Sequence, residues 1–137
     1  MRLKDKVAII TGAAHGMGEA EARLFAKEGA AVVIADVLET EGETVAAEIQ
    51  ATQGRARFIR TDVTSESDWQ RLINETIAAY GRLDILVNNA GISGSAVGDV
   101  DALEGWLKLQ SVNATSVFLG TKLAAAAMMP NGRGSIV

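Results

Sequence analysis

The sequence of 137 residues contains no cysteine, which excludes disulfide bonds, thiolate catalysis and metal sites built from thiolates. It contains a single histidine, His15, so a histidine cluster for a metal is also excluded, and we expect no metal site. The net charge of −4 includes no excess of basic residues. This balance argues against nucleic acid or an anionic membrane surface as a partner.

Long hydrophobic runs are missing as well. The stretch of lowest polarity, residues 117–130, is interrupted by Thr121 and Lys122 and is shorter than the roughly 20 apolar residues of a membrane-spanning helix. Residues 1–6 are mostly charged and lack the apolar segment of a secretory signal. With 48% hydrophobic and 22% charged residues, the composition is that of a soluble globular domain. We expect one domain with a cytoplasmic location and no association with a membrane.

Apolar segments of strand length alternate with amphipathic segments of helix length along the whole chain. This alternation is typical of βαβ units, in which helices cover a parallel sheet. The expected strands are residues 7–10, 31–35, 56–60, 84–87 and 134–137, and the expected helices are residues 19–29, 40–53, 64–80 and 103–129. Because residues 56–60 are more polar than the other strands, we place this strand at an edge of the sheet.

Three glycines, Gly12, Gly16 and Gly18, stand between the first expected strand and the first expected helix. Residues without a Cβ atom let the backbone approach a phosphate, and a helix N-terminus offers unpaired N–H groups and the positive end of a dipole. The spacing is G-x-x-x-G-x-G, which differs from the common dinucleotide pattern G-x-G-x-x-G. Alone it is a weak signal, and a tight strand-to-helix turn without a ligand is the alternative.

Asp36 follows the second expected strand, 18 residues beyond Gly18. A carboxylate at this position can accept hydrogen bonds from both hydroxyl groups of an adenosine ribose, and it repels a 2′-phosphate. The residue therefore favours NAD over NADP as the cofactor. The alternative is an exposed Asp that begins a turn.

Four features in this order resemble the short-chain dehydrogenase/reductase family. They are the pattern T-G-x-x-x-G-x-G at residues 11–18, the pair Asp62-Val63 after the third strand, the run Asn88-Asn89-Ala90-Gly91 after the fourth strand, and Asn113 in the long helix. The resemblance covers residues 6–137. It implies an α/β fold of the Rossmann type, a doubly wound parallel sheet with helices on both faces.

The resemblance also implies roles for the cofactor turn. Gly16 and Met17 would present backbone N–H groups to the pyrophosphate of the cofactor, Gly12 would allow the turn, and Gly18 completes the motif. His15 would lie on the phosphate loop, either as a pyrophosphate contact or as an exposed loop residue. For the side chains of Met17 and Trp106, packing is the simplest interpretation.

Residues after the third and fourth strands complete the expected cofactor site. Asp62 and Val63 resemble the adenine-contacting pair of the family. Asn89, Ala90 and Gly91 would line the groove near a ribose of the cofactor. We expect Asn88 to have a structural role instead, with its amide group joining neighbouring strands.

Catalysis in the family depends on an Asn-Ser-Tyr-Lys set, and only the Asn has a counterpart here, Asn113. The Tyr and Lys of the family are spaced Y-x-x-x-K on a helix, but the one tyrosine, Tyr80, is followed four residues later by Asp84. Ser135 precedes the fifth strand, whereas the catalytic Ser of the family follows it. We therefore interpret residues 1–137 as an incomplete NAD(P)-binding Rossmann domain, which is truncated at the start of the fifth strand and lacks the catalytic Ser, Tyr and Lys.

The resemblance predicts an NAD(H)-dependent oxidoreductase that interconverts a secondary alcohol and a ketone, with a small-molecule substrate such as a hydroxysteroid, simple alcohol, sugar or 3-oxoacyl thioester. One alternative is a dinucleotide-binding or subunit-pairing remnant without turnover. Another is a nucleotide-using enzyme such as a methyltransferase, which the Asn88 to Gly91 run disfavours. We also expect a homo-oligomer, a dimer or tetramer, because an open strand edge and an apolar helix flank would remain uncovered. That flank consists of Leu109, Val112, Phe118 and Leu123.

Overall fold

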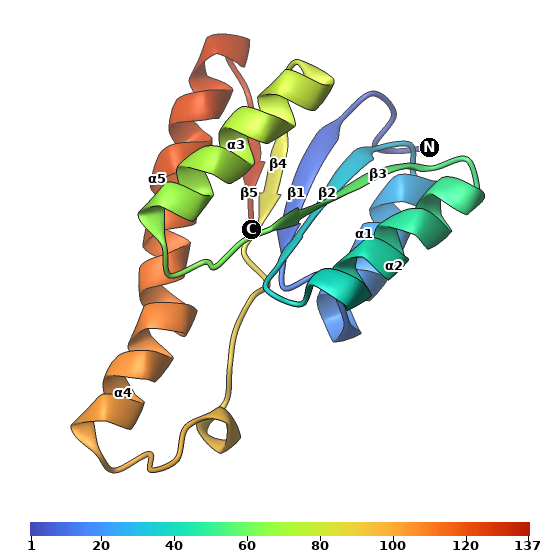
Figure 1. Ribbon diagram of the computed structural model, residues 1–137. Coiled ribbons are helices and arrows are strands. Elements are labelled where there is room, and N and C mark those ends of the chain that lie inside the picture. Colours follow the sequence, from blue (N-terminus) through green and yellow to red (C-terminus); the bar gives the residue numbers. More distant parts are fainter.

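The β-branched and alanine-rich segments form one sheet of five strands (Figure 1), as the computed structural model of residues Met1–Val137 shows. The strands are β1 (Val7–Thr11), β2 (Ala31–Asp36), β3 (Arg55–Arg60), β4 (Ile85–Val87) and β5 (Ser135–Ile136). Their order is β3-β2-β1-β4-β5, and every neighbouring pair is parallel. This arrangement confirms the predicted α/β fold and the edge position of β3.

One helix follows each of the first three strands along the chain, and two helices lie between β4 and β5. The helices are α1 (Gly16–Lys27), α2 (Glu39–Ala51), α3 (Glu66–Tyr80), α4 (Leu103–Gln110) and α5 (Ser116–Met128), with short 3-10 segments at Gly94–Ala96 and Met129–Asn131. Ser65 caps the amino end of α3, because its hydroxyl group accepts a hydrogen bond from the Asp68 N–H at 3.2 Å. Gly81 ends the same helix in the left-handed conformation, with φ of 80°.

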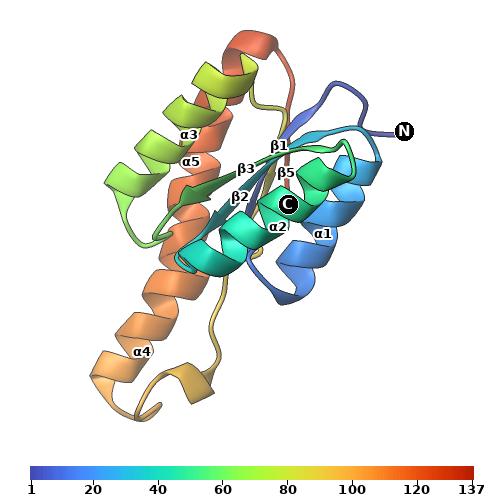
Figure 2. The same cartoon turned by 45° about the vertical axis from the view of Figure 1, so that its right-hand side comes forward.

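The helices cover both faces of the sheet (Figure 2). Successive residues of a strand point to opposite faces, so Ile10 and Ile34 pack with α1 and α2, whereas Ile9 and Val33 pack with α3 and α5. Both clusters are apolar, and this explains why β1 and β2 are fully buried along their length. The doubly wound layout places all strand carboxyl ends at one edge of the sheet.

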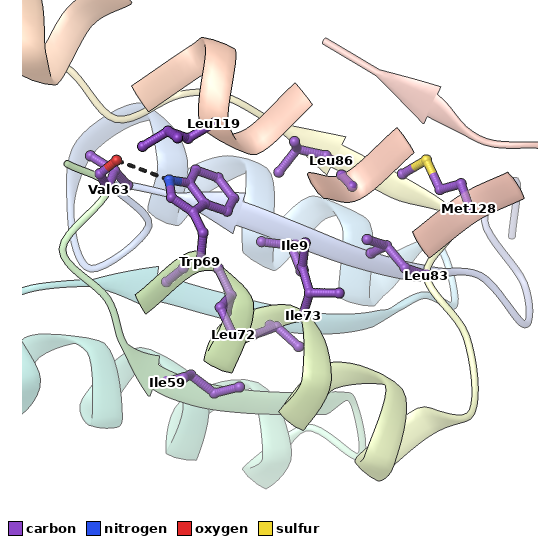
Figure 3. Packing of buried hydrophobic residues seen from close by; sticks show 13 residues of the cluster. Ile9, Ile59, Val63, Trp69, Leu72, Ile73, Leu83, Leu86, Leu119 and Met128 are labelled. Atoms are coloured by element: carbon purple, nitrogen blue, oxygen red, sulfur yellow. Dashed lines mark hydrogen bonds between the residues drawn. The ribbon is translucent and has the colours of Figure 1, made fainter. Parts of the chain in front are cut away.

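Trp69 of α3 is the largest fully buried side chain, and it lies between the sheet and α5 (Figure 3). Its indole N–H donates a hydrogen bond to the Val63 carbonyl oxygen at 2.9 Å, which satisfies the one polar group of the ring. The ring occupies the space next to Gly120 of α5. A Cβ atom at Gly120 would lie 2.5 Å from Cη2 of this ring.

The long helix predicted for residues 103–129 is present but not uniformly α-helical, because a π-helical turn at Ser111–Thr115 separates α4 from α5. In Figure 1, α4 extends beyond the end of the sheet. By length and composition alone, residues Leu103–Asn131 are apolar enough to cross a membrane, a test that core helices of soluble proteins also pass.

Two packing predictions are wrong, because the side chains of Met17 and Trp106 are 73% and 54% exposed. Trp106 belongs to α4, which has no sheet beneath it. Met17 lies in the first turn of α1, at the edge where the strands end. Of the expected apolar flank, Val112 and Leu123 pack against the core cluster, and Phe118 remains 63% exposed.

The opposite edge of the sheet is held by Asp84, a buried carboxylate just before β4. It accepts hydrogen bonds from the Val7 N–H at 3.0 Å and from the Arg82 guanidinium at 2.8 Å. Burial alone would raise the pKa of Asp84, but the hydrogen bonds from Arg82 and Val7 favour the charged form, and the net pKa is lowered. The amino ends of β1 and β4 are therefore joined by a charge-assisted contact far from the carboxyl ends.

Replacing Gly120 with Ala tests the packing around Trp69. Alanine has the higher helix propensity, by about 1 kcal/mol, but its Cβ atom would overlap the rigid indole ring, and such overpacking costs about 1–3 kcal/mol. We expect Gly120→Ala to lower the free energy of unfolding in a urea titration. The control is Thr121→Ala, at the exposed neighbouring position, which should leave stability unchanged or raise it slightly. A Gly120→Ala protein as stable as the wild type would contradict the packing described.

Candidate functional site

The order in which strands are added to the sheet reverses between β1 and β4. The strands β2 and β3 lie on one side of β1, whereas β4 and β5 lie on the other. Loops at the carboxyl ends of such strands diverge, and ligands bind in the crevice between them. A cleft of about 370 Å³ lies at this point, within the range of small-molecule sites. Its lining includes every predicted cofactor-binding residue except Gly16 and Gly18: Gly12, His15, Met17, Asp36, Asp62, Val63, Asn89, Ala90 and Gly91.

A larger hollow, about 560 Å³, lies between the carboxyl ends of α1 and α2. Its lining includes Arg23 and Glu48, which pair with each other, and it contains none of the residues of the glycine turn. It also lies at the amino-terminal edge of the sheet, where parallel α/β folds do not place ligands. We therefore assign the functional site to the smaller cleft.

The glycine turn forms the floor of this cleft. Gly12 has φ of 65°, and a Cβ atom there would lie 2.9 Å from Cα of Ala90, so the approach of the two loops requires glycine. Gly18 permits a similar approach, since its Cβ atom would lie 2.4 Å from the Gly12 carbonyl oxygen. Gly16 contributes to the turn through its φ of 62°, and neither Gly16 nor Gly18 lines the cleft.

The backbone N–H groups of Gly16 and Met17 donate to no acceptor in the protein. They belong to the first turn of α1, where N–H groups have no partner within the helix and the dipole is positive. His15 is the N-cap residue of α1, and its exposed side chain makes no capping hydrogen bond. The helix end therefore offers free donors to an anion, and no lysine or arginine lines the cleft.

Thr11 joins the ends of β1 and β4. Its hydroxyl group donates to the Val87 carbonyl oxygen at 3.3 Å and accepts from the N–H groups of Asn89 at 3.1 Å and Ala90 at 3.0 Å. The side-chain amide of Asn89 adds bonds to the carbonyl oxygens of Thr11 at 2.9 Å and Gly12 at 3.2 Å. The Asn89-Ala90 segment is thereby fixed against the glycine turn.

The structural role predicted for Asn88 belongs to Asn89 instead. The Asn88 N–H donates to the Val137 carbonyl oxygen at 2.8 Å, but its side chain makes no hydrogen bond to the protein. The Asn88 Oδ1 atom lies near Gly120, on the α5 side of the sheet. Because neighbouring residues at a strand end point in opposite directions, the amide that reaches the glycine turn is that of Asn89.

Asp36 is buried at the carboxyl end of β2, with 8% of its surface exposed. Its Oδ2 atom accepts a hydrogen bond from the Ala14 N–H at 3.0 Å, and its Oδ1 atom accepts one from the Leu38 N–H at 3.1 Å. The contact with Leu38 shows that Asp36 begins a turn, which was the alternative to a cofactor contact. The same alternative expected an exposed residue, whereas Asp36 is buried. Each carboxylate oxygen can accept further bonds, so Asp36 retains acceptors for ligand hydroxyl groups in the cleft that it lines.

Asp62 and Val63 form the wall beyond β3. The Asp62 Oδ1 atom accepts hydrogen bonds from the N–H and hydroxyl groups of Thr64, at 2.9 and 2.7 Å. Val63 is buried and holds Trp69 through its carbonyl oxygen. This wall therefore combines one apolar side chain with one carboxylate.

Asn113 lies in the π-helical turn and is not part of the cleft lining. Its side-chain amide pairs with the backbone of Ile92, accepting from the N–H at 2.8 Å and donating to the carbonyl oxygen at 2.8 Å. A Cβ atom at Gly91 would lie 3.3 Å from Asn113 Oδ1, so the residue stands beside the end of the Asn89 to Gly91 segment. π-helical turns are frequent at functional sites, and this one sets the position of Asn113.

Tyr80 is excluded as an acid or base at this cleft. Burial raises the pKa of its phenol, with Arg57 and Arg55 acting in the opposite direction, whereas a catalytic tyrosine needs a lowered pKa. Tyr80 packs against the core at the far end of α3. Ser135 does not precede the fifth strand, as predicted, but is the first residue of β5, and it is exposed.

Sequence reasoning missed several contributors to the site. Thr11 was considered only as part of the glycine motif, although its hydroxyl group joins two strands. Five residues that line the cleft were not assigned to it: Ala35, Val37, Leu38, Ile92 and Val112. A threonine at the end of a buried strand is the one available signal, because its hydroxyl needs partners there.

Comparison with known proteins connects this geometry to a family. The family model described as short chain dehydrogenase matches residues 6–137. The chain is 46% identical to 2,5-dichloro-2,5-cyclohexadiene-1,4-diol dehydrogenase LinX of Sphingobium indicum, with 99% of this chain and 54% of the relative covered. It is 44% identical to a mitochondrial borneol dehydrogenase of Lavandula x intermedia, covering 99% of this chain and 51% of that protein.

A third relative is the 3-alpha-(or 20-beta)-hydroxysteroid dehydrogenase of Mycobacterium tuberculosis, which is 41% identical, with 99% of this chain and 51% of the relative covered. The chain thus spans about half the length of the curated relatives it matches. The match includes all the elements that build the cleft.

Replacing Thr11 with Val tests the hydrogen-bonded join between β1 and β4. Valine has nearly the same shape, but the N–H groups of Asn89 and Ala90 lose their acceptor, at a cost of about 1–3 kcal/mol for each group left without a partner. We expect a lower free energy of unfolding and faster amide exchange at Asn89 and Ala90. Thr11→Ser, which keeps the hydroxyl group, should preserve slow exchange. Unchanged exchange in Thr11→Val would show that the hydroxyl does not hold this segment.

Proposed function

Because the chain belongs to the short-chain dehydrogenase/reductase family, we propose that it forms the dinucleotide-binding part of an NAD(H)-dependent oxidoreductase. The reaction is the interconversion of a secondary alcohol and a ketone by hydride transfer. One observation supports this function above the others, namely the cleft at the β1–β4 switch point, where the free N–H groups of the first turn of α1 and the Asp36 carboxylate both border the glycine turn. The names of the relatives, which denote dehydrogenases of a diol, of borneol and of a hydroxysteroid, agree with an alcohol substrate.

The residues present fit a dinucleotide. The N–H groups of Gly16 and Met17 would hold the diphosphate, Asp36 would accept from the hydroxyl groups of the adenosine ribose, and the wall of Asp62 and Val63 would contact the adenine. When bound, NAD supplies the hydride acceptor. Within this chain, Asn113 is the one residue that matches the catalytic set, and its side chain acts by fixing Ile92 beside the cleft.

The alternative is a dinucleotide-binding or subunit-pairing protein without turnover. It is favoured by the absence of a Tyr-x-x-x-Lys pair from these 137 residues. The two functions share the cofactor site and differ in catalysis. Binding and turnover must therefore be measured separately.

The first prediction concerns the choice of cofactor. Because the Asp36 carboxylate would meet a 2′-phosphate with like charge, we expect calorimetric titration to give NAD an affinity roughly tenfold or more above that of NADP. Asp36→Ala should bring the affinities for NAD and NADP closer together. Any effect of the substitution on the diphosphate group cancels in their ratio, because both cofactors contain this group. Asp99→Ala removes an exposed carboxylate outside the cleft and should leave the ratio unchanged. Equal or reversed affinities in the wild type would show that Asp36 does not contact the adenosine ribose.

The second prediction concerns turnover. Without a tyrosine of lowered pKa beside the cofactor, the 137-residue chain should give no alcohol-dependent formation of NADH above background. A suitable panel contains a hydroxysteroid, a simple cyclic alcohol and a sugar, with protein of verified mass. A rate proportional to protein concentration would contradict this prediction, and its loss in Asn113→Ala would show that catalysis depends on Asn113 without the Tyr and Lys of the family.

The third prediction concerns association. β5 is an open edge strand, and the side chains of Leu103, Trp106, Leu107 and Phe118 on α4 and α5 are more than half exposed. We propose that this surface pairs with a second copy of the chain, as a dimer or tetramer. Light scattering at micromolar concentration should give at least the mass of a dimer, and Phe118→Glu should lower it. A monodisperse wild-type monomer would contradict the proposal.

A further inference from the structure

The Asp36 side chain contacts the glycine turn as well as the cleft. Its Oδ2 atom is 3.0 Å from the Ala14 nitrogen, and its Oδ1 atom is 3.1 Å from the Leu38 nitrogen at the start of α2. The Asp36 carbonyl oxygen accepts from the Thr61 N–H at 2.9 Å. One residue thus connects three segments that surround the cleft.

The bond to Ala14 is significant because of where Ala14 lies. Residues 12–15 lead into α1, whose free N–H groups would receive the diphosphate. The Gly12 N–H is held by the Ala35 carbonyl oxygen at 2.8 Å, whereas the His15 N–H has no acceptor in the protein. The Asp36 carboxylate is therefore the side-chain contact that fixes the middle of the turn.

We propose that Asp36 is a positioning residue for the phosphate turn, so that its carboxylate supports binding of the diphosphate group common to NAD and NADP as well as discriminating between them. The proposal rests on the proposed function, because it assumes that the cleft receives a dinucleotide. The bond to Ala14 is made within the chain itself, so it restricts the freedom of the turn. Order of this kind lowers the cost of binding, since the loop loses little freedom afterwards.

Electrostatics and positioning predict opposite results at this residue. If Asp36 acts only as a negative charge near the phosphates, its removal strengthens diphosphate binding, because like charges repel. If Asp36 holds the turn, its removal weakens diphosphate binding. Inorganic pyrophosphate is the appropriate probe, because it has neither a ribose nor an adenine to contact the carboxylate directly.

The binding experiment follows the amide resonances of Gly16 and Met17 by NMR during titration with pyrophosphate. We expect Asp36→Ala to bind about threefold or more weakly than the wild type. The control is Asp99→Ala, which also removes one carboxylate, but an exposed one outside the cleft. This control should bind pyrophosphate as tightly as the wild type or more tightly. Unchanged or tighter binding by Asp36→Ala would overturn the proposal.

Amide hydrogen exchange tests the contact in the wild-type protein, without any ligand or substitution. After correction for intrinsic rates, the Ala14 N–H should exchange about tenfold or more slowly than the His15 N–H, which lacks an acceptor. Equal rates would overturn the proposal even if the Asp36→Ala protein failed to fold. Failure of the wild type to bind NAD would instead refute the proposed function and leave the exchange result valid.

Discussion

The Thr11 hydroxyl group is the contact on which the cleft depends, because it joins two strands at the point where their loops diverge. A hydroxyl group offers one donor and two acceptor positions, and at Thr11 all three are used within the protein. Packing cannot replace these bonds, since the facing residues are Gly12 and Ala90, which have almost no side chain. The cleft is therefore built by hydrogen bonds between loops that lie too close together for larger residues.

Much of the fold could be predicted because local pattern and global burial agree. The strands β1 and β2 are buried on both faces, and their sequences are correspondingly apolar throughout. In β3 three exposed arginines stand among the more buried apolar residues, which is typical of an edge strand. The ends of the elements were also predictable where a residue has one dominant role, as at Ser65 and Gly81.

The remaining features depend on the direction of side chains and on the relative position of elements in space, which a local sequence pattern does not encode. Asn88 and Asn89 are chemically identical, and only the direction of each side chain decides which one reaches the glycine turn. Trp106 lies on an apolar stripe of correct helical period, but α4 passes the end of the sheet and the stripe has no surface beneath it. The second role of Asp36 arises from the approach of residues 12–15, more than 20 positions earlier in the chain.

The π-helical turn at Ser111–Thr115 limits how the number of residues between β4 and β5 can change. An α-helix advances about 100° per residue, so the wider turn at Ser111–Thr115 sets the rotation of α4 relative to α5. Deleting one residue within the turn would remove the extra residue and leave a continuous α-helix with nearly the same phase at its two ends. Deleting one residue after the turn, between Ser116 and Phe118, would instead rotate one end against the other by about 100°. Asn113 could then no longer face Ile92 while Leu119 faced Trp69. Insertions and deletions in this helix are therefore constrained by phase, even where every exposed side chain could be exchanged.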